Sequence, residues 1–199
     1  MSMYGRVIKR WCDVAFSLLL MVSFSWLMLI IVLIYVFTFR FPIFFRQLRI
    51  GKDNRPFLMY KFRTLRNASS EQVNERRFWF GDVLRFFALD ELPQLWQVLM
   101  GQMSLVGPRA LPVDYLMRMN EMQRSRHRVR PGITGWAQVN GRHEISWEKK
   151  FELDAYYTKH LSLSLDIKIA LKTISLLLSF RKDNSLSEKK FEGTSSSPE

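Results

Sequence analysis

The hydrophobic and polar positions divide the chain into an apolar N-terminal run and a longer mixed region. No charged residue occurs between Val14 and Phe39. At about 1.5 Å per residue, a straight helix of that length could cross the hydrocarbon core of a bilayer. The run is too long for a secretory signal, and no small-residue cleavage site follows it. The pattern therefore predicts a membrane helix.

Basic residues flank the apolar run on both sides: Arg6, Lys9 and Arg10 before it, and Arg40, Arg46 and Arg49 after it. Lys and Arg favour the cytoplasmic side of a membrane, so a straight span would leave one basic cluster outside. A helix that enters, bends and leaves on one face satisfies both flanks. Ser23 and Ser25 are the only candidates for the bend, since serine hydroxyls compete for backbone carbonyls. The sequence leaves both arrangements open.

Residues 41–65 predict two strands, Ile43–Arg49 and Phe57–Arg63, around the turn sequence at residues 51–54. Period-two alternation places Lys61 and Arg63 on one strand face, opposite Leu58, Tyr60 and Phe62. Two cations on one face could bind phosphate, or they could form an ordinary solvated face.

Residues 88–109 hold the strongest candidate chemistry. Asp90 and Glu91 are followed by apolar residues at helical spacing, which predicts a helix that starts near Asp90 and ends at Gly101. Both carboxylates would then lie at the positive end of the helix dipole, ionised and pointing outward. Arg109 could return a guanidinium towards them. The alternative is an acidic N-cap on an ordinary amphipathic helix.

Four further helices are expected, at residues 69–86, 111–128, 146–160 and 161–180. Arg85 precedes Asp90 by five residues. The last helix is either interfacial or a buried core helix.

Between the second and third helices, residues 129–136 form a loop with two glycines and a proline, through which backbone amides can approach a ligand. The polar, serine-rich residues 181–199 predict disorder.

Composition narrows the partners. The chain has 199 residues, enough for one domain, with 48% hydrophobic residues and a net charge of +12. Such a charge predicts a polyanionic partner: nucleic acid, an anionic membrane surface or a phosphorylated substrate. Arginines and aromatics interleaved at residues 76–87 also suit single-stranded nucleic acid, but a membrane anchor is hard to reconcile with that partner. The single cysteine, Cys12, excludes an internal disulfide and a cysteine-based zinc cluster, and suits a reducing, cytosol-facing location.

Taken in order, these segments resemble the monotopic phosphoglycosyl transferases, also called the bacterial sugar transferase family. The resemblance covers roughly Lys9 to Phe180, and the small size is similar to members that consist of the catalytic domain alone. It rests on five blocks of sequence: KRWCD at 9–13, YKFRT at 60–64, LDELPQL at 89–95, MSLVGPR at 103–109 and RPGITGWAQVNG at 130–141.

The resemblance implies a mainly α fold with a small β-hairpin (α+β). Residues 1–40 would form a basic segment and a re-entrant membrane helix. Residues 41–180 would form a cytosolic and interfacial catalytic domain with amphipathic helices, and residues 181–199 a disordered tail. The implied reaction moves a sugar 1-phosphate from a UDP-sugar to polyprenol (undecaprenyl) phosphate at the cytoplasmic face of the bacterial inner membrane. This step begins the assembly of a lipid-linked glycan.

Matched position by position, Asp90 is the implied nucleophile, which would expel UMP and hold the phosphosugar as an acyl phosphate. Glu91 is its dyad partner, and Mg²⁺ would bind the diphosphate partly through Asp90. Arg109 matches the family's phosphate-contacting arginine. Residues 130–141 would form the nucleotide side of the site. The further residues assigned to anion binding are Lys61, Arg63, Arg85 and Arg130.

Two positions depart from the family pattern. The usual Ser-Pro pair at the bend of the membrane helix is replaced by Phe24-Ser25-Trp26, and Gln102 stands where the family usually has an acid. These departures, with the high positive charge, motivate an alternative: a non-catalytic scaffold that binds anionic lipid. The sequence indicates neither the sugar nor whether the chain forms a homo-oligomer.

Overall fold

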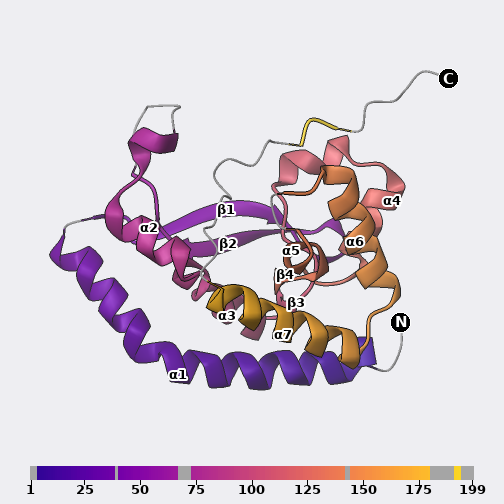
Figure 1. Ribbon diagram of the computed structural model, residues 1–199, viewed down its shortest axis with the longest axis horizontal. Coiled ribbons are helices and arrows are strands. Elements are labelled where there is room, and N and C mark those ends of the chain that lie inside the picture. The colour runs from indigo at the N-terminus through magenta and orange to yellow at the C-terminus, as the bar shows by residue number, and fades with distance from the viewer. Residues whose placement is uncertain (1–3, 39, 67–72, 142–143, 180–190, 194–199) are drawn as a thin grey trace.

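The computed structural model describes residues 4–38, 40–66, 73–141, 144–179 and 191–193. Helices dominate, and a two-stranded antiparallel hairpin lies among them (Figure 1). The predicted mainly α fold with a small hairpin is confirmed. The predictions for Phe39, for residues 67–72 and 142–143, and for most of the tail at 181–199 fall outside the described residues.

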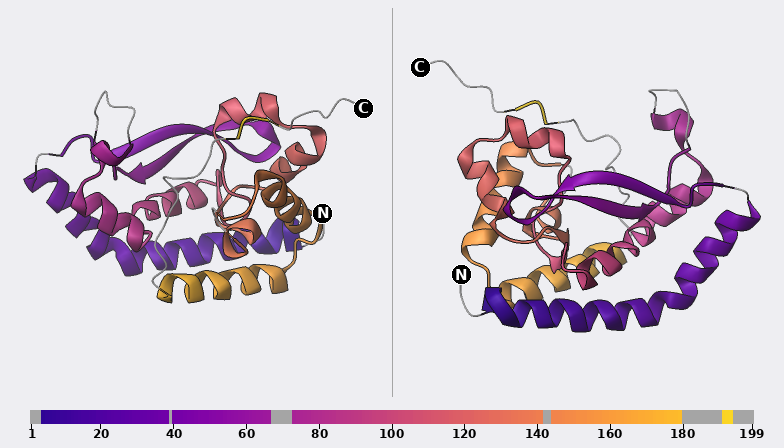
Figure 2. Two further views of the ribbon diagram at one scale, coloured as in Figure 1. Left: turned by 45° about the horizontal axis from the view of Figure 1, so that its top comes forward. Right: turned by 180° about the vertical axis from the view of Figure 1, so that it is seen from behind.

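The N-terminal run forms α1 (Lys9–Phe37), preceded by a π-helical turn at Tyr4–Ile8. It is long and apolar enough to cross a membrane. All three views show that α1 bends between its ends (Figures 1 and 2). No proline is present in it, and the Ser25 hydroxyl donates to the Val22 carbonyl at 2.8 Å. Such a bond back to the preceding turn is one of the known causes of helix bending.

Both ends of α1 pack against the same globular body. At the N-terminal end, Lys9 pairs with Asp166, and Arg10 donates to the last two carbonyls of α3 (Gln94–Leu99). At the other end, the Tyr35 hydroxyl donates to the carbonyl of Arg63. Apolar side chains along the middle of the helix, such as Val22, remain exposed. This arrangement favours the re-entrant alternative, because a straight span would separate the two ends by the thickness of a bilayer.

The hairpin pairs β1 (Phe44–Ile50) with β2 (Pro56–Phe62), in register from Phe44 opposite Phe62 to Ile50 opposite Pro56. Its turn contains two residues in the left-handed region, Asp53 and Asn54, as the turn sequence predicted. The predicted alternation also holds. Phe57 and Met59 face α3 (Gln94–Leu99), on the same side as Lys61, whereas Phe62 packs against Tyr35 of α1.

Two predicted helices are wrong in extent. In place of a helix at 69–86, the described residues form a 3₁₀ turn (Val73–Arg76) and then α2 (Trp79–Phe86). In place of a helix at 111–128, the chain forms η5 (Val113–Arg118), α4 (Glu121–Arg124) and η6 (Ser125–Arg128). The break has a local cause: Met119 is extended, and Asn120 starts α4 anew through a capping box with Gln123.

A parallel pair of short strands, β3 (Ser104–Val106) and β4 (Gly132–Thr134), was not predicted. Two glycines make the close approach of these strands possible: Gly107, directly after β3, and Gly132, the first residue of β4. A Cβ on Gly132 would lie 2.1 Å from the backbone nitrogen of Gly107. The short helix α5 (Trp136–Val139) follows β4.

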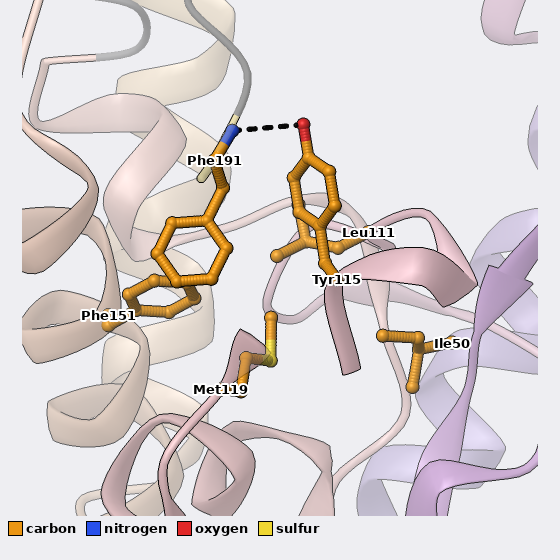
Figure 3. Packing of buried hydrophobic residues seen from close by; sticks show 6 residues of the cluster. All are labelled: Ile50, Leu111, Tyr115, Met119, Phe151 and Phe191. Carbon is orange, nitrogen blue, oxygen red and sulfur yellow. Dashed lines mark hydrogen bonds between the residues drawn. The ribbon is translucent and has the colours of Figure 1, made fainter. Parts of the chain in front are cut away.

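The two C-terminal helices are α6 (Trp147–Lys159) and α7 (Leu163–Leu178), close to their predicted bounds, with Ser146 and Ser162 as their N-caps. Beyond them, Phe191 is buried in an aromatic cluster with Tyr115 and Phe151 (Figure 3), and its N–H donates to the Tyr115 hydroxyl at 3.1 Å. This residue of the tail is therefore packed, where disorder was expected.

Candidate active site

The adjacent acids Asp90 and Glu91 lie in a 3₁₀ turn, η4 (Leu89–Glu91), before α3 begins. Ala88 enters this turn in the left-handed conformation, with φ of 54°. The helix was expected to start near Asp90 with both acids pointing outward. Helical backbone does start there as the 3₁₀ turn, and α3 itself begins at Gln94. The outward direction is wrong for Asp90, which is 8% exposed. The predicted end of the helix at Gly101, with φ of 78°, is confirmed.

Two cations from distant segments converge on the acids. Lys61 of β2 forms an ion pair with Glu91, and its Nζ lies 3.9 Å from Asp90 Oδ2. Arg109 approaches the same Glu91 oxygen as Lys61, with its Nη1 3.7 Å from Oε1. The Arg109 side chain is 39% exposed, so it can contact a ligand as well as Glu91. Two acids and two cations therefore share one site, in which an anionic ligand would meet both cations.

Gln97 of α3 joins the acid-bearing segment to β2, and the sequence analysis missed it. Its side-chain amide donates to the Leu58 carbonyl at 2.7 Å and accepts from the Tyr60 N–H at 3.0 Å. Gln97 is almost completely buried. It fixes the strand next to Lys61 relative to the helix that follows Asp90. The signal in the sequence was a polar residue on the buried face of a short helix.

Three other predicted anion-binding residues have protein partners in the structure. Arg85 pairs with Asp82 on α2. The Arg63 guanidinium is buried and donates to the carbonyl of Phe41 at 2.6 Å. Arg130 donates through Nε to the carbonyl of Gly101 at 2.7 Å. The structure thus brings Lys61 and Arg109 to the acids, and gives these three arginines contacts elsewhere.

Gln102, the position where the family usually has an acid, is exposed at the end of α3. Its side-chain oxygen lies 3.4 Å from the amide nitrogen of Gln97. His127 is buried, with its Nδ1 2.7 Å from Asn54 Oδ1. Burial, with Arg126 and Arg124 nearby, lowers the pKa of His127 to about 3. In this position His127 is a packed residue of the fold.

The donor set suits a hard divalent cation that shares its ligands with a substrate. The described residues contain no group of three or more His, Cys, Asp or Glu side chains able to hold a metal. Two adjacent carboxylates are nevertheless what Mg²⁺ uses when phosphates and water complete its shell. Asp90 and Glu91 are therefore compatible with such an ion once a diphosphate is bound.

Comparison with known proteins identifies the family. Residues 4–180 match the family described as Bacterial sugar transferase. The chain is 40% identical over 196 residues to the uncharacterized sugar transferase EpsL of Bacillus subtilis (strain 168). The match covers 94% of this chain and 97% of that protein.

Two longer relatives have named activities. One is the UDP-glucose:undecaprenyl-phosphate glucose-1-phosphate transferase of Escherichia coli (strain K12), at 36% identity over 87% of this chain. The other is the UDP-N-acetylgalactosamine-undecaprenyl-phosphate N-acetylgalactosaminephosphotransferase of Aeromonas hydrophila, at 39% over 86%. The match covers only 41% and 44% of their lengths. By the match over almost its whole length, the chain belongs to the bacterial sugar transferase family.

Proposed function

We propose that this protein transfers a sugar 1-phosphate from a UDP-sugar to undecaprenyl phosphate. The observation that carries the proposal is the buried Asp90 beside Glu91, with Lys61 close to both carboxylates and Arg109 close to Glu91. The named relatives from Escherichia coli and Aeromonas hydrophila act on UDP-sugars and undecaprenyl phosphate, which supports the substrate class.

In the proposed mechanism, an Asp90 carboxylate oxygen attacks the phosphorus that bears the sugar. The bond from that phosphorus to the bridging oxygen breaks, and UMP leaves with the bonding electrons. The product is an aspartyl phosphosugar. A phosphate oxygen of undecaprenyl phosphate then attacks the same phosphorus, and the Asp90 carboxylate is released. The transfer is thus divided into two displacements at the same phosphorus, each of which brings an anion to an anionic phosphate.

The cations around the acids make the first attack feasible. Lys61 lies next to both carboxylates, and Arg109 is placed to hold a phosphate of the donor. Glu91 orients both cations through its contacts with them. Mg²⁺, bound by the diphosphate and by Asp90, would offset the charge that develops on the departing UMP.

The proposed membrane location is supported by α1 and its neighbours. The proposal places α1 in the cytoplasmic leaflet of the bacterial inner membrane as a re-entrant helix, since both its ends pack on one body. Exposed apolar residues on α7, among them Ile167, Leu171 and Ile174, would lie at the same interface. Undecaprenyl phosphate would then reach Asp90 without leaving the membrane.

The test is UMP release by purified protein in nanodiscs with undecaprenyl phosphate, Mg²⁺ and a panel of UDP-sugars. We expect Asp90→Asn to lower turnover at least 10³-fold, since the nucleophile is lost. Asp114→Asn is the matched control, because Asp114 is an exposed carboxylate on η5. Donor radiolabelled in the sugar phosphate should label Asp90. Turnover with no label on this residue would exclude the covalent mechanism.

The alternative, a non-catalytic scaffold for anionic lipid, predicts a different outcome. Vesicle binding would survive Asp90→Ala, and no UDP-sugar of the panel would yield UMP. The net charge of +12 is compatible with either function. The cations that converge on the acids are what favour the enzyme, since a lipid-binding surface needs no buried carboxylate such as that of Asp90.

A further inference from the structure

A buried ion pair lies behind Arg109, outside the site described above. Arg126 of η6 and Asp154 of α6 are 3% and 2% exposed, with Nη2 and Oδ2 2.8 Å apart. The Phe151 ring lies 5.6 Å from the Arg126 guanidinium carbon. A buried pair of this kind is a weak source of stability, because desolvation of both charges offsets most of their attraction. Its presence calls for another role.

The same Arg126 nitrogen donates to the backbone carbonyl of Arg109, at 2.7 Å. Arg49 of β1 donates through Nη1 to the next carbonyl, that of Ala110, at 3.0 Å. Two arginines from separate elements therefore hold successive carbonyls at the point where the Arg109 side chain leaves the backbone.

The two preceding residues, Gly107 and Pro108, are hydrogen-bonded to β4. The Gly107 N–H donates to the Thr134 carbonyl at 2.8 Å, and the Gly132 N–H donates to the Pro108 carbonyl at 2.9 Å. Each of residues 107 to 110 thus has a backbone hydrogen bond to another segment. The backbone under Arg109 is fixed, which leaves only its side chain to adjust to a ligand.

We propose that Arg126 and Asp154 are positioning residues for Arg109. The inference rests on the proposed function only in that Arg109 is taken to hold a donor phosphate. Asp154 orients the Arg126 guanidinium, Arg126 holds the Arg109 carbonyl, and the Arg109 side chain then reaches to within 3.7 Å of Glu91. A shift of the backbone at residue 109 would move the guanidinium away from both Glu91 and the phosphate.

The decisive variant is Arg126→Lys. Lysine keeps the charge opposite Asp154, so the fold should survive, but a single ammonium cannot reproduce the planar fork that meets the carboxylate and the carbonyl together. Glu152→Gln is the control. Glu152 lies on α6 two residues from Asp154, but its ion pair with Lys149 is exposed.

The first readout is a double-mutant cycle with Arg109→Ala. Arg126→Lys should lower kcat/KM about tenfold in the wild-type background and less than about twofold in the Arg109→Ala background. A residue that merely supports the fold would cost the same in both. Equal losses in the two backgrounds, or no loss in either, would overturn the proposal.

The second readout is independent of activity. Hydrogen exchange at the amides of Gly107 and of residues 109–111 should become faster in Arg126→Lys and remain unchanged in Glu152→Gln. Unchanged exchange in Arg126→Lys would reject the positioning role even in an active enzyme. Faster exchange in a protein that releases no UMP would support the positioning role and reject the proposed function, so the two failures are distinguishable.

Discussion

Two buried ionic clusters among the described residues are built differently. The anchor cluster joins α1 to α7: Lys9 lies 2.7 Å from Asp166, which also accepts from the Tyr157 hydroxyl at 2.7 Å. The second is the Arg126–Asp154 pair behind Arg109. In the anchor cluster, both carboxylate oxygens of Asp166 accept a hydrogen bond. In the second, Asp154 Oδ1 and Arg126 Nε have no hydrogen-bond partner among the described residues.

The difference indicates what each cluster does. A saturated network can hold two elements together at a tolerable desolvation cost, and the anchor cluster fixes the N-terminal end of the membrane helix on the globular body. The Arg126–Asp154 pair leaves polar atoms unsatisfied, so it is a poor source of stability. Within the part of the chain that the structure describes, its side chains bond to the backbone at the Arg109 carbonyl, which points to a role in the site.

Breaking the anchor cluster should have the largest effect on stability. Lys9→Met leaves the Asp166 charge buried without its cation, and we expect a loss of about 3–5 kcal/mol in the free energy of unfolding. Chemical denaturation in detergent would measure it. Lys159→Met is the control, since Lys159 is exposed at the end of α6. A loss no larger than that of the control would mean that the anchor cluster does not hold α1.

The pH dependence of stability should separate His127 from the Arg126–Asp154 pair beside it. Burial lowers the pKa of His127 to about 3, so its contribution to stability is lost as the pH falls below the ordinary value of 6.5. Burial raises the pKa of Asp154 to about 6, against the opposing effects of Arg126 and Lys150. The folded state then gains a proton between pH 6 and 3.8 that the unfolded state does not bind, and stability rises with acidity. The two contributions have opposite signs.

Variants should reveal each contribution alone. In Asp154→Asn only His127 of the two groups still titrates, so this variant should become less stable by about 2 kcal/mol on going from pH 7 to pH 5. In His127→Asn only Asp154 still titrates, so that variant should become more stable by about 1.4 kcal/mol. Both changes are relative to the double variant, which lacks both groups. The difference between the two variants, about 3 kcal/mol, is insensitive to the other carboxylates. Parallel pH profiles would contradict both assignments.

Replacing both members of the Arg126–Asp154 pair should separate stability from activity. Arg126→Met with Asp154→Leu removes both buried charges, so the free energy of unfolding should change by less than about 2 kcal/mol. The donation to the Arg109 carbonyl is lost as well, and kcat/KM should fall about tenfold, or about 1.4 kcal/mol. Thermal unfolding and UMP release would be measured on the same preparation. Full activity in the double variant would contradict the contrast between the clusters.

The smallest effect is expected at Gln102, which belongs to neither cluster. Its side chain is exposed and contacts only Gln97 among the hydrogen bonds of the described side chains. Gln102→Asp, which restores the usual family residue, should therefore change kcat/KM by less than about twofold. A large gain would mean that an acid at this position supports the site directly.

Local patterns determined much of this protein. The uncharged run predicted α1, turn residues predicted the hairpin, and the serine before Trp147 predicted the start of α6, because each depends on neighbours in the chain. The sequence also predicted four charged residues of the site, and the structure brings them together: Asp90, Glu91, Lys61 and Arg109.

Only the tertiary structure decided the rest. That both ends of α1 return to one body depends on Asp166 and Arg63, far away in sequence, and the burial of Asp90 depends on segments packed around it. The hydrogen-bond partners of Gln97 and Arg126 could not be read from the sequence, since each side chain bonds a backbone carbonyl in a distant segment. Backbone groups are the same at every residue, so the sequence carries no mark of which carbonyl a buried side chain will hold.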